Sequence, residues 1–424
     1  MVALCVAILI VLILLGMPIG FVLLITGSIG LYFSSGYDIL QSYLSTTAYR
    51  SVNNFTFSAI PLFILMAHFI SKSKIADDLF DTVLKWFGHF PGGAGVTTIF
   101  ASAGFGALSG SSLAATSVMS QIAVPKMIQS RYSDSFASGL VATATGTLAV
   151  MIPPSIPLVL YGIQTETSIG KLLMAGIMPG IMLALLLCVT VVIVGIKQRS
   201  VTEKYPWKER FSSLKSVWPA VILVLFVIGI IYFGIATPTE SAAFGAAGAL
   251  VIGLIMRRLN YKDILDSLLA TIKQTGMIFM IIIGSVIFSY YITLSRIGND
   301  LLEIINGSGL PALAVLLLVI LLYLILGLFM DLLASMLITL PIVFPLITSL
   351  GYDPIWFGII VVLVLEIGLV TPPVGINLYI TSQHTGIPAQ KVFVGSIPFI
   401  GVLLLSILLL ILFPQIALFL PSLM

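Results

Sequence analysis

Two long apolar regions of this chain are interrupted in the same way, and these breaks constrain the fold more than any other feature. The first break spans 106–112, and a Pro-Pro pair at 153–154 follows about 40 residues later. The second spans 327–335 and is followed at a similar distance by a Pro-Pro pair at 372–373. Breaks inside a membrane helix leave backbone groups unpaired, and lipid penalises each such group by several kcal/mol. Two matched sets in the two halves of a chain indicate the central binding site of a membrane transporter.

The composition places this chain in the lipid bilayer. Of its 424 residues, 59% are hydrophobic and only 8% are charged, and the mean hydropathy is +1.19. A soluble protein carries about 25% charged residues. The longest polar stretch, at 197–216, leaves no room for a soluble domain. We therefore predict a membrane protein that has no nucleic-acid partner.

Apolar segments of about 17–25 residues are long enough to cross a membrane as helices. The sequence predicts an all-α polytopic membrane protein with about ten spans and two re-entrant helical hairpins. The spans are expected at 1–15, 18–33, 55–71, 137–160, 171–196, 217–234, 239–256, 275–292, 357–381 and 391–418. The hairpins are expected at 93–125 and 311–350, where Gly110 with its serines and Asp331 break the apolar runs.

Positive charges set the orientation, because cytoplasmic loops of membrane proteins are enriched in Lys and Arg. With the N-terminus outside and both broken regions returning to their own side, sixteen Lys and Arg residues lie inside. Arg50, Lys171 and Arg296 are the three that lie outside. Two full crossings in each broken region would give the same orientation, so the hairpin interpretation rests on the breaks themselves.

The two halves match in order but run in opposite directions through the membrane, as in the inverted repeats of alternating-access transporters. Amphipathic stretches at 74–90 and 296–305 are expected to lie along the interface and to lead into the hairpins. We predict scaffold helices at 1–71 and 217–292, and parts of a mobile transport domain at 72–165 and 293–385. The last span of the first repeat and a cytoplasmic linker are predicted at 166–216, and the last span of the second repeat at 386–424.

Hydroxyl groups and freed carbonyls at the first break are hard oxygen ligands of the kind that a dehydrated Na⁺ requires. Each proline lacks an N–H and disturbs the preceding turn, so carbonyls near 149–151 lose their donors. The predicted first sodium site consists of Ser109, Ser111, Gly146, Ala149 and Pro153. The alternative is a helix contact through small residues, since Gly106 and Gly110 form a small-xxx-small pattern.

The second break contains one acidic residue, Asp331. An unpaired acid at the centre of an apolar run costs at least about 2.5–3.5 kcal/mol, so it needs a cation, a proton or hydrogen-bond donors. The predicted second sodium site consists of Asp331, Ser335, Gly368, Val370 and Thr371. Glu366, one turn before the second Pro-Pro pair, is a similar case. The alternatives are that either acid is a satisfied structural carboxylate and that each Pro-Pro pair is a plain kink.

Polar groups next to the breaks are candidates for the substrate. We predict that Ser112, Ser155, Arg296 and Asn377 contact it. Arg296 could receive an anionic substrate, and it could equally be a helix-end charge at the lipid headgroups. The three histidines are scattered without the spacing of a transition-metal site, and no catalytic motif is present, so we expect no enzyme. The glycine-rich stretch 104–113 differs from a phosphate loop because no Lys follows it.

Several segments together resemble the large membrane subunit of the tripartite ATP-independent periplasmic (TRAP) transporters, of the DctM/SiaM type in the ion transporter superfamily. They extend in order over essentially the whole chain and comprise Ser109-Gly-Ser-Ser, Ala149-Val-Met-Ile-Pro-Pro-Ser-Ile-Pro, Gly170-Lys-Leu-Leu-Met-Ala-Gly, Thr237-Pro-Thr-Glu-Ser, Asp331, Thr371-Pro-Pro-Val-Gly and Phe413-Pro-Gln-Ile. In sialate-specific members an acidic residue is expected shortly after the first serine cluster. Here that stretch is Leu113-Ala-Ala-Thr116, which disfavours sialate and favours smaller carboxylates or other organic anions.

The resemblance implies an elevator-type secondary transporter in the bacterial inner membrane, driven by a Na⁺ gradient. It also implies two partners: a small four-helix membrane subunit of the DctQ/SiaQ type, and a periplasmic substrate-binding protein of the DctP/SiaP type. We therefore expect Na⁺-coupled uptake of an organic acid, such as a C4-dicarboxylate, delivered by the binding protein. The alternatives are a stand-alone Na⁺/dicarboxylate symporter and a passive channel.

Overall fold

The computed structural model of the protein describes residues 2–198, 204–295, 297, 303 and 310–424, and this part of the chain contains helices and no strands. The helical elements of the first half, in chain order, are α1 (Val2–Leu14), α2 (Ile19–Ser35), α3 (Tyr37–Val52), the 3-10 helix η1 (Phe55–Ser58), α4 (Ala59–Lys72), α5 (Ile75–Phe87), α6 (Gly93–Ser109), α7 (Ser112–Gln129), α8 (Asp134–Leu140), the π-helical turn η2 (Val141–Thr145), α9 (Gly146–Met151), α10 (Ile156–Gln164) and α11 (Ile169–Lys197).

The described helical elements of the second half begin after the linker. They are α12 (Trp207–Tyr232), α13 (Pro238–Ile255), α14 (Tyr261–Leu294), α16 (Ala312–Phe329), α17 (Leu332–Ser349), α18 (Pro354–Leu369), α19 (Ile376–Thr385), α20 (Ala389–Leu412), α21 (Gln415–Leu418) and the 3-10 helix η3 (Pro421–Leu423). The all-α membrane fold predicted from the sequence is confirmed.

Eight of the described helices are long and apolar enough to cross a membrane, and the bent pair 134–151 and 156–164 would make nine. The predicted number of about ten spans stays a prediction. Its two N-terminal spans correspond to α1 and α2, which have 13 and 17 residues. The predicted span 357–381 is divided between α18 and α19, as its Pro-Pro pair suggests.

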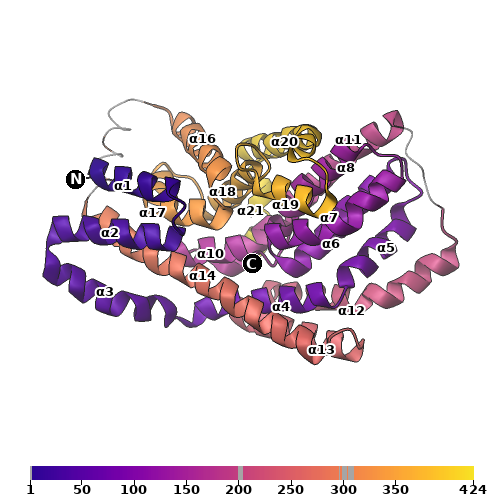
Figure 1. The fold of residues 1–424 in the computed structure, drawn as a ribbon, viewed down its shortest axis with the longest axis horizontal. Helices are drawn as coiled ribbons and strands as arrows, with labels where there is room; N and C mark the ends of the chain where they lie inside the picture. Colours follow the sequence, from indigo (N-terminus) through magenta and orange to yellow (C-terminus); the bar gives the residue numbers. More distant parts are fainter. Residues whose placement is uncertain (1, 199–203, 296, 298–302, 304–309) are drawn as a thin grey trace.

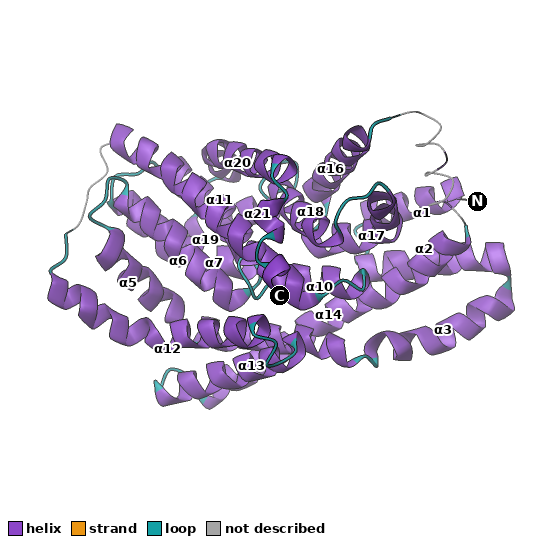
Figure 2. Ribbon diagram, turned by 180° about the vertical axis from the view of Figure 1, so that it is seen from behind, coloured by secondary structure: helices purple, strands orange, loops and turns teal. Residues whose placement is uncertain are grey.

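Two pairs of long helices, each made of one helix from each half of the chain, pack together on one side of the molecule. In Figure 1 α2, α14, α4 and α13 lie toward one side of the molecule, and α18, α19 and α20 lie toward the other. Figure 2 shows α2, α14 and α13 on the same side from behind. Helix α2 packs along α14, and α13 packs along α4. These two pairings are the ones that an inverted repeat brings into equivalent places. The division of the chain into a fixed scaffold and a mobile domain stays a prediction.

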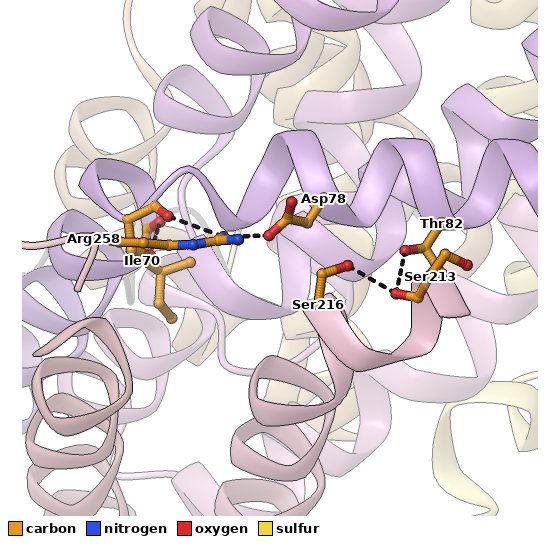
Figure 3. Close-up of polar contacts among 7 residues, drawn as sticks. Ile70, Asp78, Thr82, Ser213, Ser216 and Arg258 are labelled. Carbon is orange, nitrogen blue, oxygen red and sulfur yellow. Dashed lines mark hydrogen bonds and ion pairs between the residues drawn. The ribbon is translucent and has the colours of Figure 1, made fainter. Parts of the chain in front are cut away.

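The amphipathic stretch predicted at 74–90 forms α5, which buries Leu79 and Phe80. Figure 3 shows how polar contacts attach this helix to its neighbours. Asp78 pairs with Arg258 just beyond α13, and the Thr82 hydroxyl donates to the carbonyl of Ser213 in α12 over 3.1 Å. The corresponding stretch predicted at 296–305 lies almost entirely outside the described residues.

The two regions predicted as hairpins form pairs of helices, α6 with α7 and α16 with α17, that meet at short tips, and their re-entry from one side of the membrane stays a prediction. The first arm of each hairpin touches the broken span of its own half at backbone distance. A Cβ atom on Gly106 would lie 2.6 Å from the Cα of Ala149, and a Cβ on Gly327 would lie 3.0 Å from the Cα of Gly368. The small residues are therefore needed for this contact, in agreement with the helix-contact interpretation of Gly106.

Substituting these glycines tests the contact. We expect Gly106→Ala and Gly368→Ala to lower the free energy of unfolding by about 1–3 kcal/mol, because the added methyl group must push two backbones apart. The matched control is Gly401→Ala in α20, where a Cβ would meet nothing within 4 Å. Thermal unfolding of the purified variants in detergent measures the difference. Equal midpoints for all three variants would contradict the close packing.

Candidate functional site

Each hairpin tip begins its second helix with a side-chain cap. Ser111 caps α7, its hydroxyl accepting from the amide of Ala114 over 3.5 Å. Asp331 caps α17, its carboxylate accepting from the amide of Ala334 over 2.8 Å. Capping residues satisfy amides that a helix start leaves without partners. Two predicted sodium ligands, Ser111 and Asp331, thus occupy equivalent tip positions in the two halves and also have a structural role.

Each tip also covers the Pro-Pro break of its own half. The amide of Ile156, after the first break, donates to the carbonyl of Gly110 over 3.2 Å. The amide of Val374, after the second break, donates to the carbonyl of Leu328 over 3.2 Å. We call these two places, where a tip meets a break, the first and second junctions. They bring together segments that lie about 40 residues apart in the sequence.

The first junction contains four of the five residues predicted for the first sodium site. Ser109 and Ser111 lie at the tip, and Ala149 and Pro153 belong to the break segment beneath it. The hydroxyl of Ser109 is buried and has no hydrogen-bond partner among the described residues. Gly146 lies one turn earlier and faces Ser112 instead.

The residues predicted for the second sodium site lie on the two segments of the second junction. Asp331 lies at the tip, Ser335 lies one turn into α17, and Gly368, Val370 and Thr371 form the edge of the break. The hydroxyl of Ser335 is buried and has no partner in the described part of the chain, whereas that of Thr371 donates to the carbonyl of Ile367 over 2.6 Å. A buried polar group without a partner is costly, and a bound water or ion can satisfy it. One unsatisfied hydroxyl thus lies at the tip of the first hairpin, and another lies one turn beyond the tip of the second.

The residues predicted to contact substrate are in different environments. The side chains of Ser112 and Asn377 are hydrogen-bonded to each other over 3.0 Å inside the protein. Ser155 is enclosed and caps α10, its hydroxyl accepting from the amide of Leu158 over 3.4 Å. Arg296 lies outside the described residues.

A cavity lies between the two tips and one face of α14. The two tips contribute polar groups of Ser111, Ser112 and Asp331, and α14 contributes Gln274. The remaining lining is mainly apolar and comprises Gly110, Leu113, Val150, Ile156, Pro157, Met277, Ile278, Ile281, Leu332, Leu333 and Leu369. Among these lining residues Asp331 carries the one charge. An apolar cavity with few convergent polar groups is the usual form of a small-molecule site.

Sequence reasoning missed two features of this region. Gln274 stands at the polar start of an apolar run, where it is indistinguishable from a helix-flanking residue. Glu366 is a second carboxylate in an apolar segment and is not among the residues predicted for either sodium site. The structure places it beside Ser112, whose hydroxyl donates to it over 3.0 Å.

Comparison with known proteins decides the family. The sequence model of the DctM component of the tripartite ATP-independent periplasmic transporters matches residues 6–416. This chain belongs to that family. The resemblance seen in the sequence is thereby confirmed, and the chain is a member of a family of membrane transporters.

Curated relatives cover nearly the same length as this TRAP chain. The C4-dicarboxylate large permease protein DctM of Pseudomonas aeruginosa is 35% identical over 89% of both chains. The sialic acid large permease protein SiaM of Vibrio cholerae is 32% identical over 96% of this chain and 95% of its own. The ectoine large permease protein TeaC of Halomonas elongata is 34% identical over 100% and 99%. These relatives are transporter permeases and not enzymes.

Two solved transporters share the fold at low sequence identity. The YdaH transporter of Alcanivorax borkumensis superposes with a TM-score of 0.61 at 14% identity, covering 87% of both chains. MtrF of Neisseria gonorrhoeae superposes with a TM-score of 0.62 at 13% identity, covering 94% of this chain and 93% of its own. These likenesses concern the helical architecture alone.

Serine-to-alanine variants can distinguish whether the unsatisfied hydroxyls at the junctions bind an ion or only fill space. We expect Ser109→Ala and Ser335→Ala to be no less stable than wild type in choline, because each removes a buried group that forms no hydrogen bond. Ser111→Ala should lose about 0.5–2 kcal/mol because it removes a helix cap. In Na⁺, both Ser109→Ala and Ser335→Ala should gain less thermal stability than wild type, since each lacks one ion ligand.

Thermal unfolding in matched Na⁺ and choline buffers measures both effects. Ser406→Ala is the control, because the Ser406 hydroxyl donates to Val402 within α20, away from both junctions. Equal losses of stability in Na⁺ and in choline would show that the two serines serve packing.

Proposed function

We propose that this protein carries an organic acid inward across the bacterial inner membrane together with Na⁺. The single observation that carries the proposal is the pair of junctions, each combining a helix break and a capped tip with one unsatisfied buried hydroxyl at the tip or one turn beyond it. Hydroxyl, carboxylate and carbonyl oxygens are hard ligands, which suit a cation such as Na⁺. The first and second sodium sites are proposed at the first and second junctions, respectively.

The cavity between the tips is the proposed binding place of the organic acid. It lies next to both junctions, so an ion at either junction would stabilise an anionic cargo through its charge. The relatives named above carry C4-dicarboxylates, sialic acid and ectoine in their names. The absence of an acid at 113–116 disfavours sialate, so we propose a C4-dicarboxylate or another small organic anion.

The proposed movement is that of an elevator. Both hairpins and both broken spans form the moving unit, and α2, α4, α13 and α14 form the fixed part. The partners proposed from the family are the small four-helix membrane subunit and the periplasmic substrate-binding protein. The exposed apolar faces of the described helices would contact lipid and the small subunit. A stand-alone symporter differs by needing no binding protein, and a channel differs by needing no ion gradient.

Reconstitution tests the coupling. In proteoliposomes containing this chain and its small subunit, with the binding protein and its acid outside, uptake should require an inward Na⁺ gradient. The physical reason is that the two junctions are incomplete without their cations. Equal uptake in K⁺ or choline would contradict the proposal. Undiminished uptake without the binding protein would instead favour the stand-alone symporter.

A charge-removing variant tests the second junction. Asp331→Asn should keep the cap of α17, because Asn caps helices as well as Asp does. Losing a contact to a charged group is worth about 1.5–3 kcal/mol. The half-saturating Na⁺ concentration for transport should therefore rise at least tenfold, with unfolding temperature and assembly with the small subunit unchanged.

The matched control for this variant is Asp353→Asn, which alters another helix cap. Asp353 accepts from the amides of Ile355 and Trp356 at the start of α18 and lies outside both junctions. Near-normal Na⁺ dependence in Asp331→Asn, together with lowered thermal stability, would identify Asp331 as a structural acid.

A further inference from the structure

A buried polar cluster, whose Ser112 also borders the cavity between the tips, lies where the first hairpin meets the second broken span. It consists of Glu366 near the end of α18, Ser112 at the start of α7 and Asn377 at the start of α19. Helices α7 and α19 lie side by side in both views (Figures 1 and 2). The Ser112 hydroxyl donates to Oε2 of Glu366 and accepts from Nδ2 of Asn377, each over 3.0 Å. The cluster thus joins the two halves of the chain.

Two oxygen atoms of this cluster lack partners. Glu366 and Asn377 are both 0% exposed, and neither Oε1 of Glu366 nor Oδ1 of Asn377 has a hydrogen-bond partner among the described residues. The ion pairs within the described ranges join Lys72 to Asp266, Lys126 to Asp81 and Arg258 to Asp78, and none of them includes Glu366. Burying a carboxylate without a counter-charge is strongly unfavourable. A bound cation would compensate the charge of the carboxylate and would give the unpaired oxygen atoms a partner.

Gly146 lies against all three side chains of the cluster. A Cβ on Gly146 would lie 2.5 Å from Oγ of Ser112, 2.6 Å from Nδ2 of Asn377 and 3.0 Å from Oε2 of Glu366. Any larger residue would therefore fill the space among the three side chains. Gly146 directly follows the π-helical turn η2, a local irregularity that is frequent at functional sites. The hydroxyl of Thr143, in that turn, is also buried without a described partner.

We propose that Glu366, Asn377 and Ser112 hold a Na⁺ ion in the membrane interior, at a site separate from the two junctions. One carboxylate matches the charge of one monovalent cation, and a divalent cation would leave a net positive charge in the cluster. The alternative is a proton on Glu366, which would remove the charge and could be donated to Oδ1 of Asn377, and Na⁺ binding to the variants below separates the two. The ion would tie α7 to α18 and α19, so its binding would couple the first hairpin to the second half of the chain.

This inference rests on the proposed Na⁺ coupling, and its test measures binding separately from transport. The purified transporter is titrated with radiolabelled Na⁺ to obtain the number of ions bound at saturation. We expect Glu366→Gln, which has nearly the same shape and no charge, to bind one Na⁺ fewer for each molecule than wild type. Glu209→Gln is the matched control, because Glu209 is exposed in the first turn of α12 and should bind as wild type does.

A second variant keeps the test decisive if Glu366→Gln does not fold. Asn377→Ala removes one oxygen ligand and keeps the carboxylate, so the half-saturating Na⁺ concentration of one bound ion should rise about fivefold or more. Unchanged binding in the folded Glu366→Gln variant, or in Asn377→Ala when the first variant does not fold, overturns the inference and leaves the proposed Na⁺ coupling intact. Wild-type protein that binds no Na⁺ and transports without it overturns both.

Discussion

Lipid offers no hydrogen bonds to an interrupted backbone, and the rest of this structure depends on that constraint. Each Pro-Pro break ends a helix inside an apolar region, and in each half a hairpin tip supplies the missing partner. The amides of Ile156 and Val374 donate to tip carbonyls over the same distance of 3.2 Å. The first arm of each hairpin must therefore approach its broken span closely, which Gly106 and Gly327 permit.

The two junctions share a geometry but differ in charge. The first tip carries neutral serines, whereas the second carries Asp331 at the equivalent capping position. Under the proposed function, a cation at the second junction would be neutralised by its carboxylate, and one at the first would keep its full charge. That remaining charge lies next to the cavity between the tips, where it would favour an anionic cargo.

The sequence predicted both hairpins, both breaks and the helix α5, because proline, glycine and charge act locally on the backbone. It did not predict α3, where Ser, Thr and Gln lower the hydropathy, or the extension of α14 back to Tyr261, where Lys and Asp residues lower it. Asn260 and Asp263 form a capping box that marks the true start of α14, and this local signal is present in the sequence. The contacts of Ser112 with Glu366 and Asn377 join positions 254 and 265 residues apart, which no local pattern reveals.

The central claim is that each junction binds Na⁺, and a direct image of the ions tests it best. Electron cryomicroscopy of the complex with its small subunit, prepared in Na⁺ and in choline, would compare the two junctions at matched resolution. We predict density between Ser109 and the segment 149–153, and between Ser335 and the segment 368–371, in Na⁺ but not in choline. Junctions that look the same in both preparations, with no density in Na⁺, would contradict this account.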